Sequence, residues 1–141
     1  MEINDNVIAS SNSVMARNLF YLGSYFREND YKQQAKQMLT NVYEGMEMYG
    51  SGYSNWAILL NHQVYGCFEA VVMGKDAKST LREIWKKATP EMVFAGSEKQ
   101  SDIPLLKDKS LSGEDVIYIC TEGVCHAPTS DVEEALQTVF Q

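Results

Sequence analysis

Apolar and polar positions follow two different periods along the chain, and the change falls near residue 66. Before it, apolar residues recur every three or four positions, which is the period of an amphipathic helix. After it, short apolar runs alternate with helical segments, as in α/β folds. The sequence therefore predicts a helical hairpin region over residues 1–65 and a small α/β unit over residues 66–141.

The first predicted helix lies within "SSNSVMARNLFYLGSYFREND", which opens with Ser and Asn, residues that cap helix N-termini well. One face of this helix carries Val14, Asn18, Leu22, Tyr25 and Phe26, with Met15 and Leu19 beside them. A short third helix is expected around residues 56–63. Tight turns between the helices indicate antiparallel packing.

The second predicted helix starts at Asp30, where Gln33 three positions later completes a capping-box pattern, and it ends at Gly50. Its apolar stripe consists of Tyr31, Ala35, Met38, Leu39, Val42, Met46 and Tyr49. Two helices in a hairpin cannot bury all of this apolar surface. We therefore expect the face of the first helix to pack on further helices, either in a homodimer or in a longer chain.

The region after Gly66 contains three short apolar runs that predict strands, "CFEAVVMG", "MVFAG" and "DVIYICTEG". An amphipathic helix capped by Asp76 and stopped by Pro90 follows the first run. A final helix begins at a capping box formed by Ser130 and Glu133. These elements predict a small, mostly parallel three-stranded sheet. The fold class is therefore expected to be α+β and mainly helical.

Composition narrows the possible partners and the expected location. The formal net charge of -7 argues against nucleic acid and anionic membrane surfaces, which attract clustered Lys and Arg. No apolar run approaches the roughly 20 residues that a membrane span needs, and the N-terminus lacks a signal-peptide pattern. Three cysteines without an export signal favour free thiols in the reducing cytoplasm.

Two segments carry a resemblance to a known family. "DNVIASSNSVMARNLFYLG" resembles the pattern D-x-x-x-P-S-x-N-S-V-A-x-x-N-L, although Ala9 stands where the family usually has Pro and Ser11 where it often has Gly. "VIYICTEGVCHAPTSDVEEAL" resembles a closing segment with C-x-x-x-x-C-x-x-P. Both patterns belong to the YyaL-like and spermatogenesis-associated protein 20-like family of thioredoxin domain-containing proteins. The resemblance covers essentially the whole chain but only the C-terminal fraction of a full member.

The resemblance implies an architecture and a function. Full members carry a thioredoxin-like domain, then an (α/α)6 toroid similar to N-acylglucosamine 2-epimerases and some glycosidases, then a small α/β tail. Residues 1–65 would be the last toroid helices, whose partners would be the absent toroid and thioredoxin-like domain. This implies a C-terminal module that is non-catalytic alone and contributes to a cavity for a small, carbohydrate-like polar ligand, with no cofactor expected.

The loop "NDNVIASSNS" is the candidate ligand-binding segment under this resemblance. Loops that enter inner toroid helices rim the central cavity, so its polar side chains would face sugar hydroxyls: Asp5, Asn6, Ser11, Asn12 and Ser13. The alternative is helix capping, because Ser, Asn and Asp before a helix satisfy its first free N–H groups. A second segment, "VVMGKDAKS", has the strand–turn–helix form that holds phosphate, but it lacks the glycine fingerprints of nucleotide sites.

The stretch "CTEGVCHAP" contains the remaining candidate residues for metal binding or redox chemistry. Zinc needs three or four ligands, and Cys120, Cys125 and His126, even with Cys67, do not have a zinc-site spacing, so no metal is expected. A turn such as Thr-Glu-Gly-Val can bring Cys120 and Cys125 within disulfide range, which makes them candidate redox residues. A packing role at a strand end remains the alternative.

Overall fold

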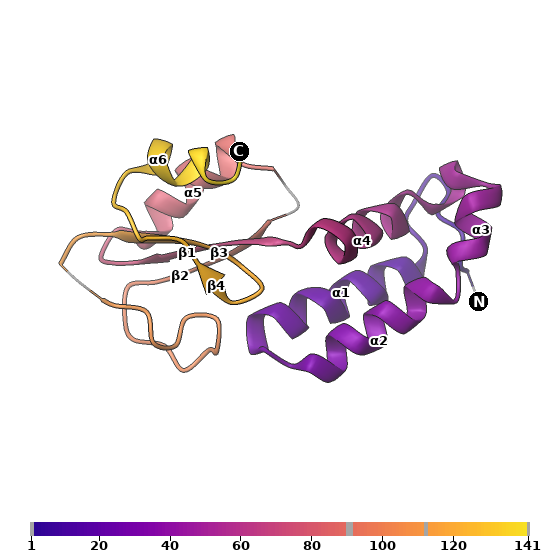
Figure 1. The fold of residues 1–141 in the computed structure, drawn as a ribbon, viewed down its shortest axis with the longest axis horizontal. Coiled ribbons are helices and arrows are strands. Elements are labelled where there is room, and N and C mark those ends of the chain that lie inside the picture. Colours follow the sequence, from indigo (N-terminus) through magenta and orange to yellow (C-terminus); the bar gives the residue numbers. More distant parts are fainter. Residues whose placement is uncertain (1, 90–91, 112, 141) are drawn as a thin grey trace. The chain divides into compact units, whose positions relative to one another are not determined.

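The computed structural model describes residues 2–89, 92–111 and 113–140 (Figure 1). The chain divides into two compact units, Met1–Gly66 and Cys67–Gln141, which are described separately. About half of the residues are helical, and the fold is α+β. Within the described ranges, no helix is both long enough and apolar enough to cross a membrane.

The first unit is entirely helical. Helices α1 and α2 lie side by side as an antiparallel hairpin, and α1 also packs on α4 (Figure 1). Its elements are α1 (Ser11–Phe26), α2 (Asn29–Thr40), α3 (Tyr43–Met48), the 3-10 helix η1 (Gly50–Tyr53) and α4 (Ser54–Tyr65).

The long second helix predicted from Asp30 to Gly50 is wrong in two respects. Helix α2 begins one residue earlier, after Glu28, and no side chain caps it. It stops at Thr40, and a separate helix starts at Tyr43. The break falls on Thr-Asn-Val, three residues that have low helix propensity in succession. The apolar stripe of the sequence gave no sign of this interruption.

Helix α1 buries mainly small residues together with Phe20, and it exposes several large apolar ones. Ala16, Ser13 and Phe20 are among its buried side chains. The apolar face identified from the sequence points outward instead. Four of its residues are 42 to 54% exposed, namely Val14, Met15, Leu22 and Phe26.

The second unit is a four-stranded sheet with two helices. Its elements are β1 (Phe68–Met73), α5 (Ala77–Lys87), β2 (Val93–Ser97), β3 (Val116–Thr121), β4 (Val124–Cys125) and α6 (Val132–Gln137). The strand order is β2-β1-β3-β4. Only β1 and β2 are parallel, whereas β3 runs antiparallel to both β1 and β4. The predicted three-stranded, mostly parallel sheet is therefore wrong, because the sheet is mixed and has a fourth strand.

The direction of β3 follows from how β2 and β3 are connected. Strands β1 and β2 are parallel, so both end at the same edge of the sheet. A third parallel strand would need a crossover back to the opposite edge, usually through a helix. The connection over residues 98–115 shows no helix in its described part, and β3 starts at the edge where β2 ends. A polar segment without a helix should have suggested this antiparallel return.

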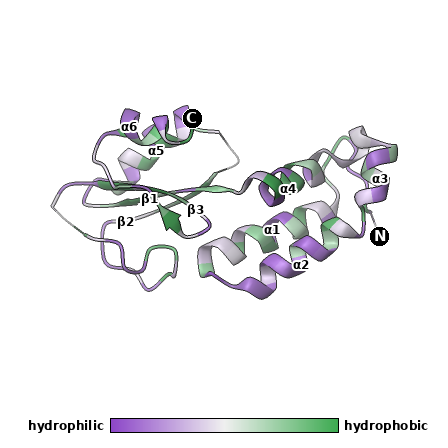
Figure 2. Cartoon of the chain, in the orientation of Figure 1, coloured by the Kyte–Doolittle hydropathy of each residue, from purple (hydrophilic) through white to green (hydrophobic). Residues whose placement is uncertain are grey.

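The two faces of the sheet differ in chemistry. One face, which α5 and α6 cover, is aliphatic, and Figure 2 colours the strands beneath those helices as largely hydrophobic. Its buried residues form one cluster: Ala70, Val72, Ala77, Ile84, Met92, Ile117, Ile119, Ala135 and Leu136. The alternation of side chains places Glu69, Tyr118 and Cys120 on the opposite face. Lys109 of the β2–β3 connection lies against that second face, beside Tyr118 and Cys120.

The final helix starts one residue later than predicted. The N-cap of α6 is Asp131, whose Oδ1 accepts the N–H groups of Glu133 at 2.7 Å and Glu134 at 3.2 Å. The predicted capping box of Ser130 with Glu133 is therefore wrong. Glu133 is instead paired with Lys87 of α5. An Asp at the cap explains the shift, since its carboxylate reaches two free N–H groups of the first turn.

Candidate functional site

Strands β3 and β4 form a hairpin with a two-residue turn, and this turn brings two cysteines together. Glu122 and Gly123 both have positive φ, at 51° and 87°. Positive φ at both central positions is the signature of a type I′ turn, whose twist matches the flanking strands. Thr121 then pairs with Val124, and Cys120 with Cys125.

The two paired cysteines are joined by a disulfide. Their sulfurs are 2.10 Å apart and their Cα atoms 3.9 Å apart. Cys120 is fully buried, whereas Cys125 is partly exposed at the edge of the hairpin. A reagent arriving from solvent therefore meets the sulfur of Cys125 first.

A lysine from the β2–β3 connection lies beside both sulfurs. The Nζ of Lys109 is 2.9 Å from Sγ of Cys125 and 3.8 Å from Sγ of Cys120. It also lies 4.9 Å from the centre of the Tyr118 ring, within cation–π range. The Tyr118 hydroxyl accepts the backbone N–H of Ser110 at 3.1 Å, which fixes the connection beside the lysine. The site thus combines a disulfide, a cation and an aromatic ring.

Glu69 is a buried carboxylate on the same face of the sheet. It is 2% exposed, and it lies directly opposite Cys120 in the β1–β3 register. Directly paired residues project their side chains to the same side. Neither Glu69 nor Lys109 was singled out from the sequence. A charged residue inside the apolar run "CFEAVVMG" is the signal that points to Glu69, whereas Lys109 sits in a polar segment with nothing to mark it.

The other residues considered with the cysteine pair do not join it in a metal cluster. Cys67 is buried and lies outside the disulfide, and its Sγ donates to the carbonyl of Phe68 at 3.6 Å. His126 is exposed, and its backbone N–H donates to Ile119 at 2.9 Å. Among the residues that the structure describes, no three His, Cys, Asp or Glu side chains are grouped to hold a metal ion.

In the helical unit, Asp5 is the centre of the predicted ligand loop, and its carboxylate is occupied by the chain itself. One oxygen, Oδ1, accepts the hydroxyl of Ser13 at 2.6 Å and the N–H of Ser10 at 2.9 Å. The other, Oδ2, accepts the N–H of Asn55 at 2.9 Å. Burial raises the pKa of Asp5, but these hydrogen bonds outweigh it and hold the pKa below its ordinary value.

The rest of the predicted loop divides between internal contacts and solvent. Ser10 caps α1, and its Oγ accepts the N–H of Ser13 at 3.1 Å. The side-chain amide of Asn12 donates to the carbonyl of Glu2 at 2.6 Å. Asn6 and Ser11 are exposed. Of the five candidate residues, Asp5, Asn12 and Ser13 therefore hold the segment together, whereas Asn6 and Ser11 are exposed and Asn12 is half-buried.

The turn before α5, which has the form of a phosphate-binding turn, binds a carboxylate of its own chain instead. Asp115 accepts the backbone N–H of Asp76 at 3.0 Å and the hydroxyl of Thr80 at 2.5 Å. Gly74 makes room for it, because a Cβ at this position would lie 2.2 Å from Oδ1 of Asp115. Anions favour such helix N-termini, and here Asp115 occupies the position that a phosphate would take.

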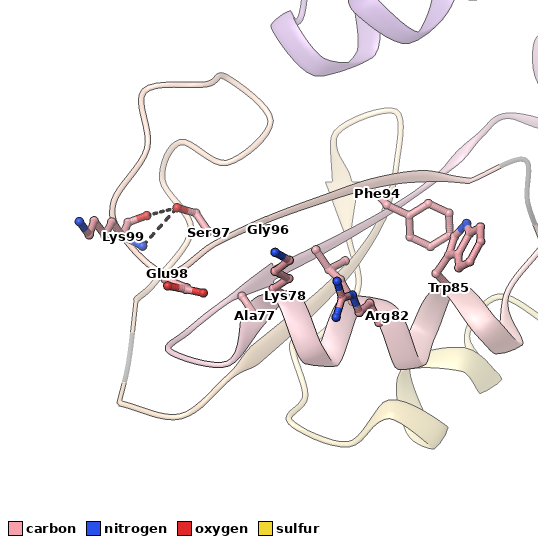
Figure 3. A pocket seen from close by; sticks show the side chains of 10 residues that line it. Ala77, Lys78, Arg82, Trp85, Phe94, Gly96, Ser97, Glu98 and Lys99 are labelled. Atoms are coloured by element: carbon pink, nitrogen blue, oxygen red, sulfur yellow. Dashed lines mark hydrogen bonds between the residues drawn. The ribbon is translucent and has the colours of Figure 1, made fainter.

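A cavity of about 570 Å³ lies between α5 and β2 (Figure 3). Its apolar lining includes Leu81, Trp85 and Phe94, and the rings of Trp85 and Phe94 lie side by side in Figure 3. Charged residues at its margin are Lys78, Arg82, Glu98 and Lys99. The cavity was not predicted from the sequence, because an apolar Trp85 on an amphipathic helix is ordinarily expected to pack in the core.

A polar chain links three elements of the helical unit. Nη1 of Arg17 donates to Asn55 at 2.5 Å, and Nη2 donates to the hydroxyl of Tyr21 at 3.3 Å. The Tyr21 hydroxyl lies 3.4 Å from Nε2 of His62, whose ring stacks on Phe20 at 5.1 Å between centroids. His62 is 4% exposed and packed in the core of the helical unit.

Comparisons of the chain with protein-family profiles, with curated proteins and with solved structures found no match.

Proposed function

We propose that Cys120 and Cys125 form a reversible dithiol–disulfide centre that exchanges two electrons with a partner dithiol. The observation that carries this proposal is the position of the Lys109 ammonium, 2.9 Å from Sγ of Cys125. A neighbouring cation favours the thiolate over the thiol, and the thiolate is the form that attacks and leaves in exchange. A cross-link that served only to hold a hairpin would gain nothing from a partly buried cation beside its sulfurs.

The small loop that the disulfide closes also supports an exchange role. The cysteines are five positions apart, and the turn already holds them in register. The chain-entropy model gives only about 2 kcal/mol for a loop of this length. In the reducing cytoplasm that the sequence suggests, cysteine pairs of this kind are usually transient and catalytic or redox-sensing.

The exchange proceeds in two steps. A thiolate of the partner dithiol attacks Sγ of Cys125, the bond to Cys120 breaks, and Cys120 leaves as a thiolate near the Lys109 ammonium. The second thiol of the partner, as its thiolate, then attacks the partner sulfur of the mixed disulfide and releases Cys125 as a thiolate. The partner ends as a disulfide, the pair ends reduced by two electrons, and the reverse sequence restores it.

A redox titration tests the proposal. The protein is equilibrated with dithiol–disulfide buffers of graded potential, its thiols are alkylated, and the products are separated by mass. We expect one two-electron transition within the span of biological dithiols, roughly -300 to -120 mV. A pair that stays oxidised across this whole span is a structural cross-link, and that result overturns the proposal.

Lysine variants test the role of the cation. In a Cys67→Ala background, the reduced Lys109→Met protein should be alkylated about tenfold more slowly near neutral pH, because its thiolates lose the ammonium. Lys107→Met is the matched control, since Lys107 is exposed on the same connection. Equal rates in the three proteins would remove the main support for an exchange function.

A second proposal concerns the helical unit, and the exposed apolar residues of α1 favour it. We infer that this face packs on further helices, as the resemblance to toroid proteins implies, in a module that contributes to a cavity for a polar ligand. Exposed Leu22 and Phe26 on one helix face support such packing. Light scattering on the purified chain separates this from self-association. A measured mass of twice 15.9 kDa for the wild-type protein, together with a mass of 15.9 kDa for Leu22→Glu, would show a homodimer instead.

A further inference from the structure

Strand β2 forms one edge of the sheet, and only one of its two sides pairs with β1. The carbonyl of Ser97 accepts the N–H of Gly74 at 3.1 Å, so the backbone of Ser97 faces β1. Because successive residues of a strand alternate, the N–H and C=O of Gly96 face the open edge. Gly96 is exposed, and in the described part of the chain no strand pairs with this side of β2.

The cavity next to this edge is apolar inside. Leu81, Trp85 and Phe94 line it, and Figure 3 shows the last two rings adjacent, one from α5 and one from β2. Trp85 is 62% exposed, which is high for a large aromatic side chain in contact with others. A volume of about 570 Å³ holds one large side chain with room for its neighbours.

The margin of the cavity is cationic in an acidic protein. Lys78 and Arg82 lie four residues apart on α5 and point to the same side in Figure 3. Lys99 at the end of β2 adds a third cation, and Glu98 is the one carboxylate among the ten lining residues. The chain as a whole has a net charge of -7, so the margin of the cavity is opposite in sign to the net charge of the chain.

We propose that the groove between α5 and the outer edge of β2 binds an extended acidic peptide segment, which adds to the sheet as a strand beside β2. Its backbone pairs with the outward groups of β2. An apolar side chain enters the cavity against Trp85, and carboxylates on the same face of the peptide meet Lys78 and Arg82. The occupant is a peptide rather than a small acid, because the edge supplies backbone donors and acceptors in line with the cavity.

The dimensions set the length of the segment. Strand β2 has five residues and spans about 17 Å at about 3.4 Å per residue. Side chains on one face of a strand recur every second residue, so an acidic–apolar–acidic order at alternate positions matches the groove. A suitable probe is the fluorescein-labelled, end-capped peptide Thr-Glu-Thr-Phe-Thr-Glu-Thr. Its controls replace both Glu residues by Lys, or Phe by Ala.

Fluorescence anisotropy with the full chain tests the binding and its chemistry. The probe should bind saturably, and both control peptides should bind at least tenfold more weakly. Arg82→Glu and Trp85→Ala should each weaken the probe about tenfold, whereas Lys86→Glu should leave it unchanged. Lys86 is the matched control, because it is an exposed lysine on α5 that does not line the cavity. No saturable binding up to about 1 mM overturns the proposal.

Backbone methylation tests strand addition without altering the protein. Only one edge of an added strand faces β2, and N–H groups on that edge come from alternate residues. Of two probes, N-methylated at the odd or at the even positions, one should lose binding and the other should keep it. The amide of Gly96 should become protected from hydrogen exchange with the probe bound. Equal binding of both methylated probes would show that charge alone holds the peptide, and a dimer through β2 would assign the edge to a second copy. Either result overturns the proposal.

Discussion

The polar cluster around Asp5 in the helical unit and the cysteine cluster in the α/β unit differ in whether their reactive groups are already fully engaged. Around Asp5, each carboxylate oxygen already accepts a hydrogen bond from Ser10, Ser13 or Asn55. Around Cys120 and Cys125, a cation faces a bond that can be broken and re-formed. Polar side chains whose hydrogen bonds are all made within the fold stabilise that fold. A cation beside two bonded sulfurs instead favours thiol–disulfide exchange.

The largest effect is expected at Asp5. Asp5→Ala should lower the free energy of unfolding of the helical unit by about 2–3 kcal/mol, because the variant leaves the buried N–H of Ser10 and the partly buried N–H of Asn55 without an acceptor. Denaturant unfolding of the Trp85→Phe background, which keeps Trp56 of α4 as the fluorescent reporter, measures it. Asp30→Ala, an exposed acidic residue of α2, is the control. If Asp5→Ala unfolds like the control, the Asp5 cluster is not structural and the ligand hypothesis for its loop gains weight.

Breaking the disulfide should have a smaller effect on stability. Cys120→Ala with Cys125→Ala should destabilise the α/β unit by about 2 kcal/mol or less, since the closed loop is short. Circular dichroism through a denaturant series measures it, and Cys67→Ala is the buried-cysteine control. A loss of 4 kcal/mol or more would make the disulfide mainly structural and would erase the contrast between the two clusters.

The pH dependence of the Asp5 cluster should be smaller still. The folded pKa of Asp5 lies below its unfolded value of about 3.9. Its contribution is therefore complete above that value and is lost as the pH falls through the folded pKa. Wild type should lose more stability on acidification below about pH 4 than Asp5→Asn does, with Asp30→Asn as the control. Parallel curves would show that the hydrogen bonds do not favour the ionised form.

The smallest effect is expected at an exposed pair outside both clusters. The hydrogen bond to Glu133 raises the pKa of Lys87, although burial opposes this, and the pair joins α5 to α6. Its contribution is present below the unfolded pKa of lysine and is lost as the pH rises through the folded value. Lys87→Met should leave the midpoint of unfolding at pH 7 within error, because exposed ion pairs contribute little. A clear shift would mean that surface charge matters here as much as the buried clusters.

The sequence predicted local features well and long-range ones poorly. The helix after Asp76 and the strand "CFEAVVMG" were recognised, because apolar periods are encoded within a few residues. Capping was predicted less well, since the side chain of Asp76 makes no capping hydrogen bond with α5. The direction of β3 and the position of Lys109 depend on residues far apart in the chain. The candidate pair of cysteines was visible from its spacing, but the lysine beside it was not. The cavity beside Trp85 arises only when α5 packs against β2.

The Glu122–Gly123 turn has a consequence for the evolution of this hairpin. Side chains alternate between faces of a sheet, so one inserted residue between Thr121 and Val124 would turn Cys125 to the opposite face from Cys120. The length of this turn thus determines whether the two cysteines can form a disulfide. Glu122 can change in identity as long as the residue tolerates positive φ, but the turn cannot change in length and keep the two thiols within reach.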